Sequence, residues 1–156
     1  MPERSKYVEF TYPKKGEIAE GKRGYMKKPT TKRLRVKAWG LFSEWVRRRD
    51  ADSNGYNRCV ACGKREHWKD LHAGHFYHGK NWMSAMDERN VFPECNKCNT
   101  YLGGNLIEYS EFLRKKFGPD IIDTLRELRH QGWKPNRLEL EELIERYRQK
   151  LSELNA

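Results

Sequence analysis

The chain of 156 residues carries 32 Lys and Arg against 22 Asp and Glu, which gives a net charge of +10. Hydrophobic residues make up 37% and charged residues 35%, a balance that predicts one domain with a modest core and an appended arm or helices. No apolar run approaches the ~20 residues that cross a bilayer, and the N-terminus lacks the apolar stretch of a secretory signal. We therefore expect a soluble, cytoplasmic protein with no membrane partner.

The positive charge is concentrated at the N-terminal end. Residues 1–50 hold 15 Lys and Arg against 6 Asp and Glu, whereas the rest of the chain is nearly balanced. Such a segment favours a polyanion, either nucleic acid or an anionic membrane surface, although a solvated tail is the alternative. Arg47, Arg48, Arg49 and Lys80 are the candidate phosphate contacts.

In chain order, the composition of residues 1–29, rich in Gly, Pro and Lys, predicts a basic flexible arm with at most a short strand at residues 7–12. Within residues 30–57, the spacing of apolar residues predicts a helix that is capped by Thr30 or Thr31 and runs to about Arg49. A turn-rich linker follows it. Residues 58–104 alternate short strand-like pieces with turn formers.

Residues 105–156 return to a helical period, with helices expected over 105–117 and 120–130. A third begins after Pro135, where Asn136 and Glu139 form a capping-box pattern. Its apolar residues repeat as a heptad seam: Leu140, Ile144, Tyr147, Leu151 and Leu154. We expect this short seam to pack against its own domain rather than to form a coiled coil, while a homodimer stays open as a partner.

All four cysteines fall in two Cys-x-x-Cys pairs, Cys59 with Cys62 and Cys95 with Cys98. Two such pairs supply the four thiolates of a tetrahedral structural zinc site, and disulfides are rare inside cells. A zinc ion with four thiolate ligands is closed to substrate. We therefore predict that it holds the core together, and that any chemistry lies elsewhere.

Three histidines lie between the cysteine pairs, in the stretch LHAGHFYHGK at residues 71–80. A neutral imidazole can accept a proton near neutral pH, so His75 is a candidate general base. The order of a Cys-x-x-Cys pair, His75, Asn90 and a second pair followed at once by Asn99 resembles the HNH, or ββα-metal, nucleases. The resemblance implies an α+β fold, with a small zinc-stapled, treble-clef-like core over residues 58–104 and flanking helices.

Further motifs narrow this resemblance. The segments KAWGLFSEWVRRRD, CVACG, HAGHF, DERNVFPECNKCN, GGNLIEY and KPNRLELEELIERYRQKLSEL, in this order, resemble the NinG (Rap) family of lambdoid bacteriophage recombination proteins over about residues 36–154. The resemblance implies a metal-dependent endonuclease that cleaves branched DNA, namely Holliday junctions and D-loops. It also implies phage recombination proteins as candidate partners and the bacterial host cytoplasm as the location.

The implied site contains His75 and Asn90 as catalytic residues, and Asn99 and His72 as ligands of a catalytic Mg²⁺ or Mn²⁺. Many HNH enzymes carry an acidic ligand directly before the base, but here position 74 is Gly, so His72 is the substitute. An imidazole ligand fits Mn²⁺ better than Mg²⁺. Asn90 is expected to fix the loop behind His75 through backbone hydrogen bonds. The alternative role for His72 is that of an ordinary strand residue whose side chain is hydrogen-bonded to the backbone.

Two other functions remain open from the sequence. One is an HNH endonuclease that nicks duplex DNA or assists genome packaging. The other is a zinc-stapled DNA-binding module without catalysis, in which Gly74 marks a degenerate metal site.

Overall fold

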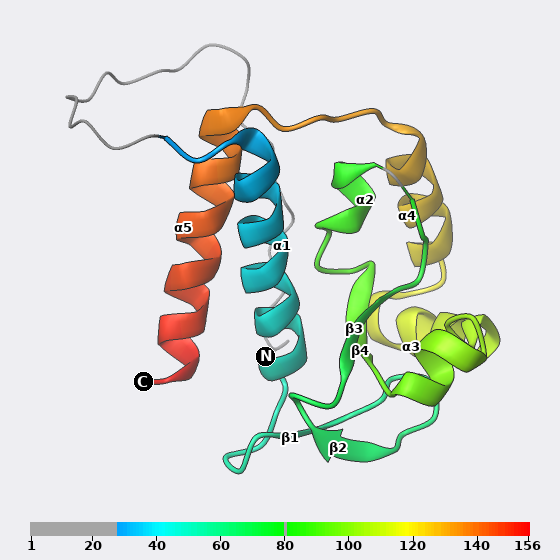
Figure 1. Ribbon diagram of the computed structural model, residues 1–156. Coiled ribbons are helices and arrows are strands. Elements are labelled where there is room, and N and C mark those ends of the chain that lie inside the picture. Colours follow the sequence, from blue (N-terminus) through cyan, green and yellow to red (C-terminus); the bar gives the residue numbers. More distant parts are fainter. Residues whose placement is uncertain (1–27, 80) are drawn as a thin grey trace, which may run out of the picture.

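The computed structural model describes residues 28–79 and 81–156 (Figure 1). It is a mixed α+β arrangement, as predicted, and its strands form two small antiparallel hairpins. The elements in chain order are α1 (Thr31–Arg48), β1 (Tyr56–Arg58), β2 (Arg65–His67), β3 (His72–His75), α2 (Trp82–Ala85), β4 (Val91–Glu94), the short π-helix η1 (Lys97–Tyr101), α3 (Leu106–Phe117), α4 (Ile121–His130) and α5 (Arg137–Leu154).

Helices α1 and α5 lie side by side and run in the same direction (Figure 1). At their N-terminal ends Arg137 donates to the carbonyl of Pro29 at 2.9 Å, and at the other ends Arg48 donates to the side chain of Asn155 at 2.6 Å. Thr30 caps α1 by accepting a hydrogen bond from the Arg33 amide, which supplies one of the partners that a helix start lacks.

The predicted seam of α5 is buried inside the molecule. Leu140, Ile144, Tyr147 and Leu151 pack in one core cluster with the apolar face of α1, whereas Leu154 at the helix end is 39% exposed. The predicted capping box of Asn136 and Glu139 is present. The seam therefore packs against the chain's own helix, as expected.

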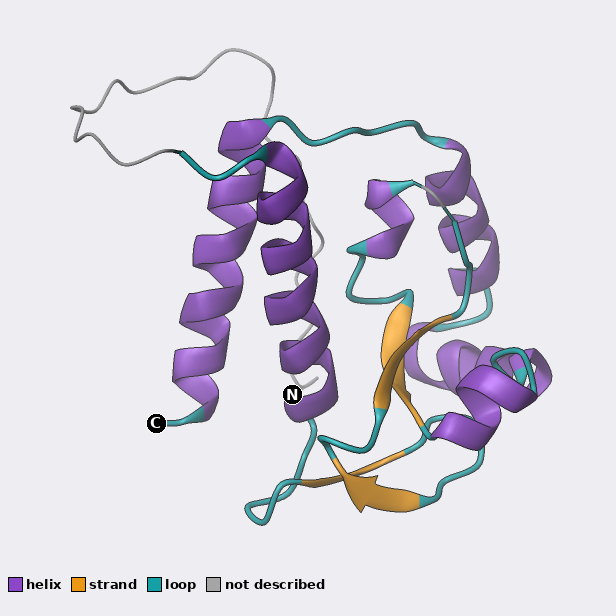
Figure 2. Ribbon diagram, viewed as in Figure 1, coloured by secondary structure: helices purple, strands orange, loops and turns teal. Residues whose placement is uncertain are grey.

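The hairpin of β3 and β4 lies between α1 and the α3–α4 pair (Figure 2). Its register pairs His72 with Glu94 and His75 with Val91. Side chains alternate between the two faces of a strand, so Ala73 and Val91 join the core under α1. Phe76 and Phe92 join a second core with Tyr109, Leu113 and Leu125 from α3 and α4.

The helices expected at both ends of the chain are present within a residue or two of their predicted bounds. The short helix α2 was not predicted. A helix was expected to start at the second cysteine pair, because no helix breaker follows it directly, and the structure has the single π-helical turn η1 there. The strand suggested at residues 7–12 lies outside the described residues, as does most of the basic arm. Within the described part of the chain, no helix has both the length and the apolar character to cross a membrane.

Candidate metal centre and histidine sites

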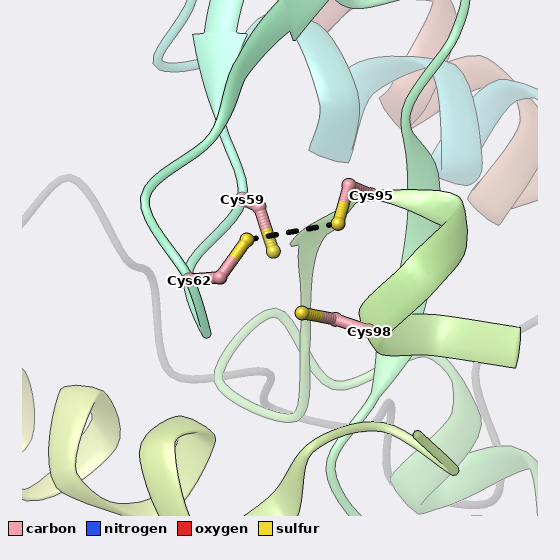
Figure 3. Close-up of side chains that lie close together, drawn as sticks. All are labelled: Cys59, Cys62, Cys95 and Cys98. Atoms are coloured by element: carbon pink, nitrogen blue, oxygen red, sulfur yellow. Dashed lines mark hydrogen bonds between the residues drawn. The ribbon is translucent and has the colours of Figure 1, made fainter. Parts of the chain in front are cut away.

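The side chains of the four cysteines form one cluster (Figure 3). Their sulfur atoms all lie within 4.8 Å of one another, and the Sγ atoms of Cys62 and Cys95 are 3.7 Å apart. Four thiolates around zinc at ~2.3 Å lie ~3.8 Å apart, so the cluster fits a tetrahedral ion such as zinc. Burial raises the pKa of the Cys59 thiol, so the thiolate form needs a bound cation to be stable.

Two turns bring the cysteines together. Cys59 and Cys62 lie in the β1–β2 turn, where Gly63 adopts a φ of +75° that other residues rarely tolerate. Cys95 directly follows β4, and Cys98 lies in η1. The Val60 amide also donates to the Pro93 carbonyl at 3.0 Å. A metal bound here would therefore join the first hairpin to the second hairpin and to η1.

The two predicted ligands of a catalytic metal lie in contact beside this centre. The Nδ1 atom of His72 and the Nδ2 atom of Asn99 are 3.1 Å apart. His72 is exposed at the start of β3, and Asn99 is half-buried one residue after Cys98. The strand and the turn after the cysteine pair thus bring two candidate ligands together at the surface.

His75 lies in a separate cavity of about 490 Å³, which is also lined by Trp39, Trp82 and His78. Its ring stacks on Trp39 with a centroid distance of 5.1 Å, and its Nε2 atom is 3.1 Å from the carbonyl of Ala85. A carbonyl only accepts, so Nε2 carries the hydrogen and Nδ1 is left as the proton acceptor. Burial lowers the pKa of His75, which favours the neutral ring near pH 7.

Asn90 is fully buried and is saturated with backbone hydrogen bonds. Its amide nitrogen donates to the carbonyls of Tyr77 at 3.0 Å and Ser84 at 2.8 Å, and its oxygen accepts from the Tyr77 amide at 2.8 Å. These are the loop-fixing bonds that were expected. Asn90 positions the loop that follows His75, and its side-chain atoms are already engaged by the protein.

Glu94 was not singled out from the sequence, yet its environment is unusual. Its side chain is fully buried, and within the described part of the chain neither carboxylate oxygen has a hydrogen-bond partner. Burial, and then the charge of Cys62, raise the pKa of Glu94 to about 8. Only the strand register could have signalled this residue, because it places Glu94 opposite His72.

The arginine cluster does not form a free basic patch. The side chain of Arg49 is only 5% exposed and donates to the carbonyls of Glu88 and Val91, so its guanidinium already has partners within the protein, and its contact with DNA stays a prediction. Arg47 donates to the carbonyls of Ser43 and Trp68, and Arg48 pairs with Glu44. These residues chiefly hold α1 against its neighbours, while Lys80 lies outside the described residues.

A sequence profile described as the bacteriophage lambda NinG protein matches residues 14–156 of this chain. The chain belongs to the NinG family. Curated NinG proteins of Escherichia phage 933W and Salmonella phage P22 are each 29% identical to it over 116 residues, and that of Escherichia phage lambda is 28% identical.

Each of these NinG alignments covers 70% of this chain and 52% of the relative, so the chain spans about half the length of the curated NinG proteins that it matches. No solved structure matches the chain. The resemblance to NinG seen in the sequence is therefore confirmed at the level of the family.

Proposed function

We propose that this NinG-family protein is a metal-dependent DNA endonuclease with an HNH-like ββα-metal core, and that it cleaves branched recombination intermediates such as Holliday junctions and D-loops. The observation that carries the proposal is the contact between His72 and Asn99 beside the cysteine centre. One comes from the first strand of a hairpin and the other directly follows the last cysteine, which is the arrangement expected of a ββα-metal site.

His72 and Asn99 would hold a divalent cation through an imidazole nitrogen and an amide oxygen. Mn²⁺ accepts this mixed set readily, and Mg²⁺ prefers the oxygen ligand. When bound, such a cation offsets the negative charge that develops on a phosphodiester during hydrolysis. The cysteine centre serves structure only, because four thiolates leave no open position.

His75 supplies the candidate base. Its Nδ1 atom accepts a proton from the attacking water, while the Ala85 carbonyl holds Nε2–H and fixes the tautomer. The lowered pKa of His75 keeps its ring neutral at working pH, as a base requires. Stacking on Trp39 and the hydrogen bonds of Asn90 set the position of the ring and of the loop that follows it.

The substrate must reach both groups around one edge of the hairpin. His72 and His75 are three residues apart on β3, so their side chains leave opposite faces of the strand. Among the described strands β3 pairs with β4 alone, which leaves its other edge unpaired. In the proposed complex the DNA backbone passes along this edge, with the metal ligands on one face and His75 on the other.

Binding would rest on backbone contacts rather than on base sequence. The positive excess lies in the first 50 residues, and on α1 the side chains of Lys32, Arg33 and Lys37 are exposed. Contacts of this kind are weakened by salt and carry no sequence information, which suits an enzyme that reads the shape of a junction.

The test is cleavage of a labelled four-way junction and of a matched linear duplex by wild type and His75→Gln, with Mg²⁺ and with Mn²⁺. His130→Gln is the matched control, because His130 is exposed at the end of α4. Zinc content and junction binding are measured for every variant. We expect junction-selective cleavage that His75→Gln removes while binding and zinc content stay at wild-type levels.

Other results would redirect the proposal. Equal cutting of junction and duplex would identify a general HNH nuclease, such as a nicking or packaging enzyme. Tight junction binding without cutting under either metal would identify a zinc-stapled DNA-binding module.

A further inference from the structure

Glu94 is a carboxylate buried without a partner. Neither of its oxygens is hydrogen-bonded within the described part of the chain, and its side chain has no exposed surface. A buried carboxylate without a hydrogen bond or a cation is costly by several kcal/mol. Buried charges in proteins are therefore either paired with an opposite charge or bound to a metal ion. The position of the Glu94 carboxylate indicates a metal ion.

The carboxylate occupies the space of a missing side chain on β3. A Cβ atom built on Gly74 would lie 1.9 Å from the Oε2 atom of Glu94, far inside any allowed contact. Gly74 stands where many HNH enzymes, which this chain resembles, carry an acidic metal ligand. Glycine at this position leaves room for a carboxylate that arrives from β4 instead.

Glu94 also lies on the same face of the hairpin as the His72–Asn99 contact. The register pairs Glu94 directly with His72, and directly opposed residues have Cβ atoms only ~4.5–5.5 Å apart. Gly74, over which the carboxylate lies, is two residues along β3 and so on that same face. Three potential ligands, from β3, β4 and η1, thus lie on the same side of the hairpin.

We propose that Glu94, His72 and Asn99 together form a divalent-cation site in which Glu94 supplies the anionic ligand. This inference rests on the proposed function for its catalytic meaning, but the site itself is a claim about binding. The donor set of one carboxylate, one imidazole and one amide oxygen fits Mn²⁺, and it fits Mg²⁺ less well.

The observed contact agrees with such a site. Two ligands at right angles around an ion with bonds of ~2.1 Å lie ~3.0 Å apart. The His72 Nδ1 atom and the Asn99 amide group are 3.1 Å apart, and rotation of that amide by half a turn places its oxygen at this point. The buried Glu94 carboxylate then offsets the cation charge from beneath.

The test measures Mn²⁺ binding directly, by electron paramagnetic resonance of free Mn²⁺ titrated against the 156-residue chain carrying one zinc ion. Wild type is expected to bind one Mn²⁺. Glu94→Gln keeps the size of the side chain and removes its charge, and it should weaken binding by at least ~10-fold, the lower end of the loss seen when even an outer partner of a metal site is removed.

His72→Ala is a second test variant, because this exposed side chain can be truncated without disturbing the core. It should also weaken Mn²⁺ binding. Glu88→Gln is the matched control: Glu88 is also buried, but its Oε1 atom accepts hydrogen bonds from Tyr147 and Lys150. Mn²⁺ affinity in this control should equal that of wild type.

Two outcomes overturn the inference: wild type that binds no Mn²⁺ beyond zinc, or Glu94→Gln that binds it as tightly as wild type. Glu94 would then be a buried neutral acid that only fills the space above Gly74. These failures differ from failure of the proposed function. Glu94-dependent Mn²⁺ binding without DNA cleavage supports the proposed cation site and rejects the nuclease. Mn²⁺-dependent DNA cleavage, together with unchanged Mn²⁺ binding by Glu94→Gln, supports the nuclease and rejects Glu94 as a ligand.

Discussion

The ring of His75 is held on three sides at once, by the stacked Trp39 ring, the Ala85 carbonyl and the loop that Asn90 fixes. This confinement sets both its tautomer and its pKa. Because burial disfavours the charged ring, the pKa in the folded state lies below the ordinary value of 6.5, and protonation favours the unfolded chain.

This pKa shift predicts how stability depends on pH. The contribution of a neutral His75 is complete above about pH 6.5, and it is lost as the pH falls below that value toward the folded-state pKa. His75→Gln removes the titrating group. We expect urea unfolding at pH 8.0, 7.0, 6.0 and 5.5 to give a wild-type free energy of unfolding that falls, relative to the variant, below pH 6.5.

Comparing the two proteins at each pH cancels the pH dependence of zinc binding, which they share. A difference in unfolding free energy that stays constant from pH 8.0 to 5.5 would show that the His75 ring is not desolvated in the folded state.

Site residues could be predicted from the sequence only where neighbouring residues alone indicate their role. The cysteines were predicted because the Cys-x-x-Cys spacing by itself brings two thiolates to one side of an ion. Glu94 gave no such signal, since its role depends on the β3–β4 register and on the space left by Gly74. The burial of Arg49 was missed for a similar reason, because a run of three arginines does not say which one faces the core.

At the scale of elements, the α1–α5 pair packs against one face of the β3–β4 hairpin. The apolar faces of both helices were visible as three- and four-residue periods, so their bounds were predicted well. Helix α2 was missed because four residues are too few to establish a period, whereas a helix was expected at the second cysteine pair, where η1 lies. The partner of the α5 seam was expected within the chain, but only the structure identifies it as α1.

Truncation of the seam tests this pairing. Leu140 is fully buried, and Leu140→Ala should lower the free energy of unfolding by about 2–5 kcal/mol, because it removes buried surface and leaves a cavity. Val36 on α1 is 69% exposed, and Val36→Ala should change the free energy by less than about 0.5 kcal/mol. Chemical denaturation measures both variants.

The same variants separate internal packing from dimerisation. If the α5 seam joined two copies of the chain, Leu140→Ala would shift the protein to a smaller species in analytical ultracentrifugation, and its stability loss would depend on protein concentration. Packing within the chain predicts an unchanged sedimentation coefficient and a loss that is independent of concentration.

At the scale of the molecule, strand β4 links the three clusters of buried residues found in the described part of the chain. Val91 joins the core of α1 and α5, Phe92 joins that of α3 and α4, and Cys95 follows directly at the metal centre. A metal at the cysteines therefore supports both larger cores through one strand. Neither long-range link could be read from the sequence, because each depends on which face of β4 a residue occupies.

Removal of zinc should consequently affect the entire fold. Chelation, or Cys95→Ser, is expected to lower the melting temperature of the α-helical signal, and not merely to loosen the β1–β2 turn. Circular dichroism at 222 nm, with zinc content measured in parallel, checks this, and added zinc should restore the chelated wild type. An unchanged melting curve in protein shown to be free of zinc would mean that the cysteine centre does not support the helical cores.

The most direct measurement of the central claim is single-turnover cleavage of a labelled four-way junction by wild type, Asn99→Ala and Asn96→Ala in Mn²⁺. Asn96 directly precedes η1 and bonds only to Thr100 among the described side chains, so it is the matched control. The account predicts that wild type and Asn96→Ala cut the junction, while Asn99→Ala binds it normally and cuts it roughly a hundredfold more slowly or not at all. Equal cleavage by all three proteins would contradict the account, because the reaction would then not depend on the His72–Asn99 site.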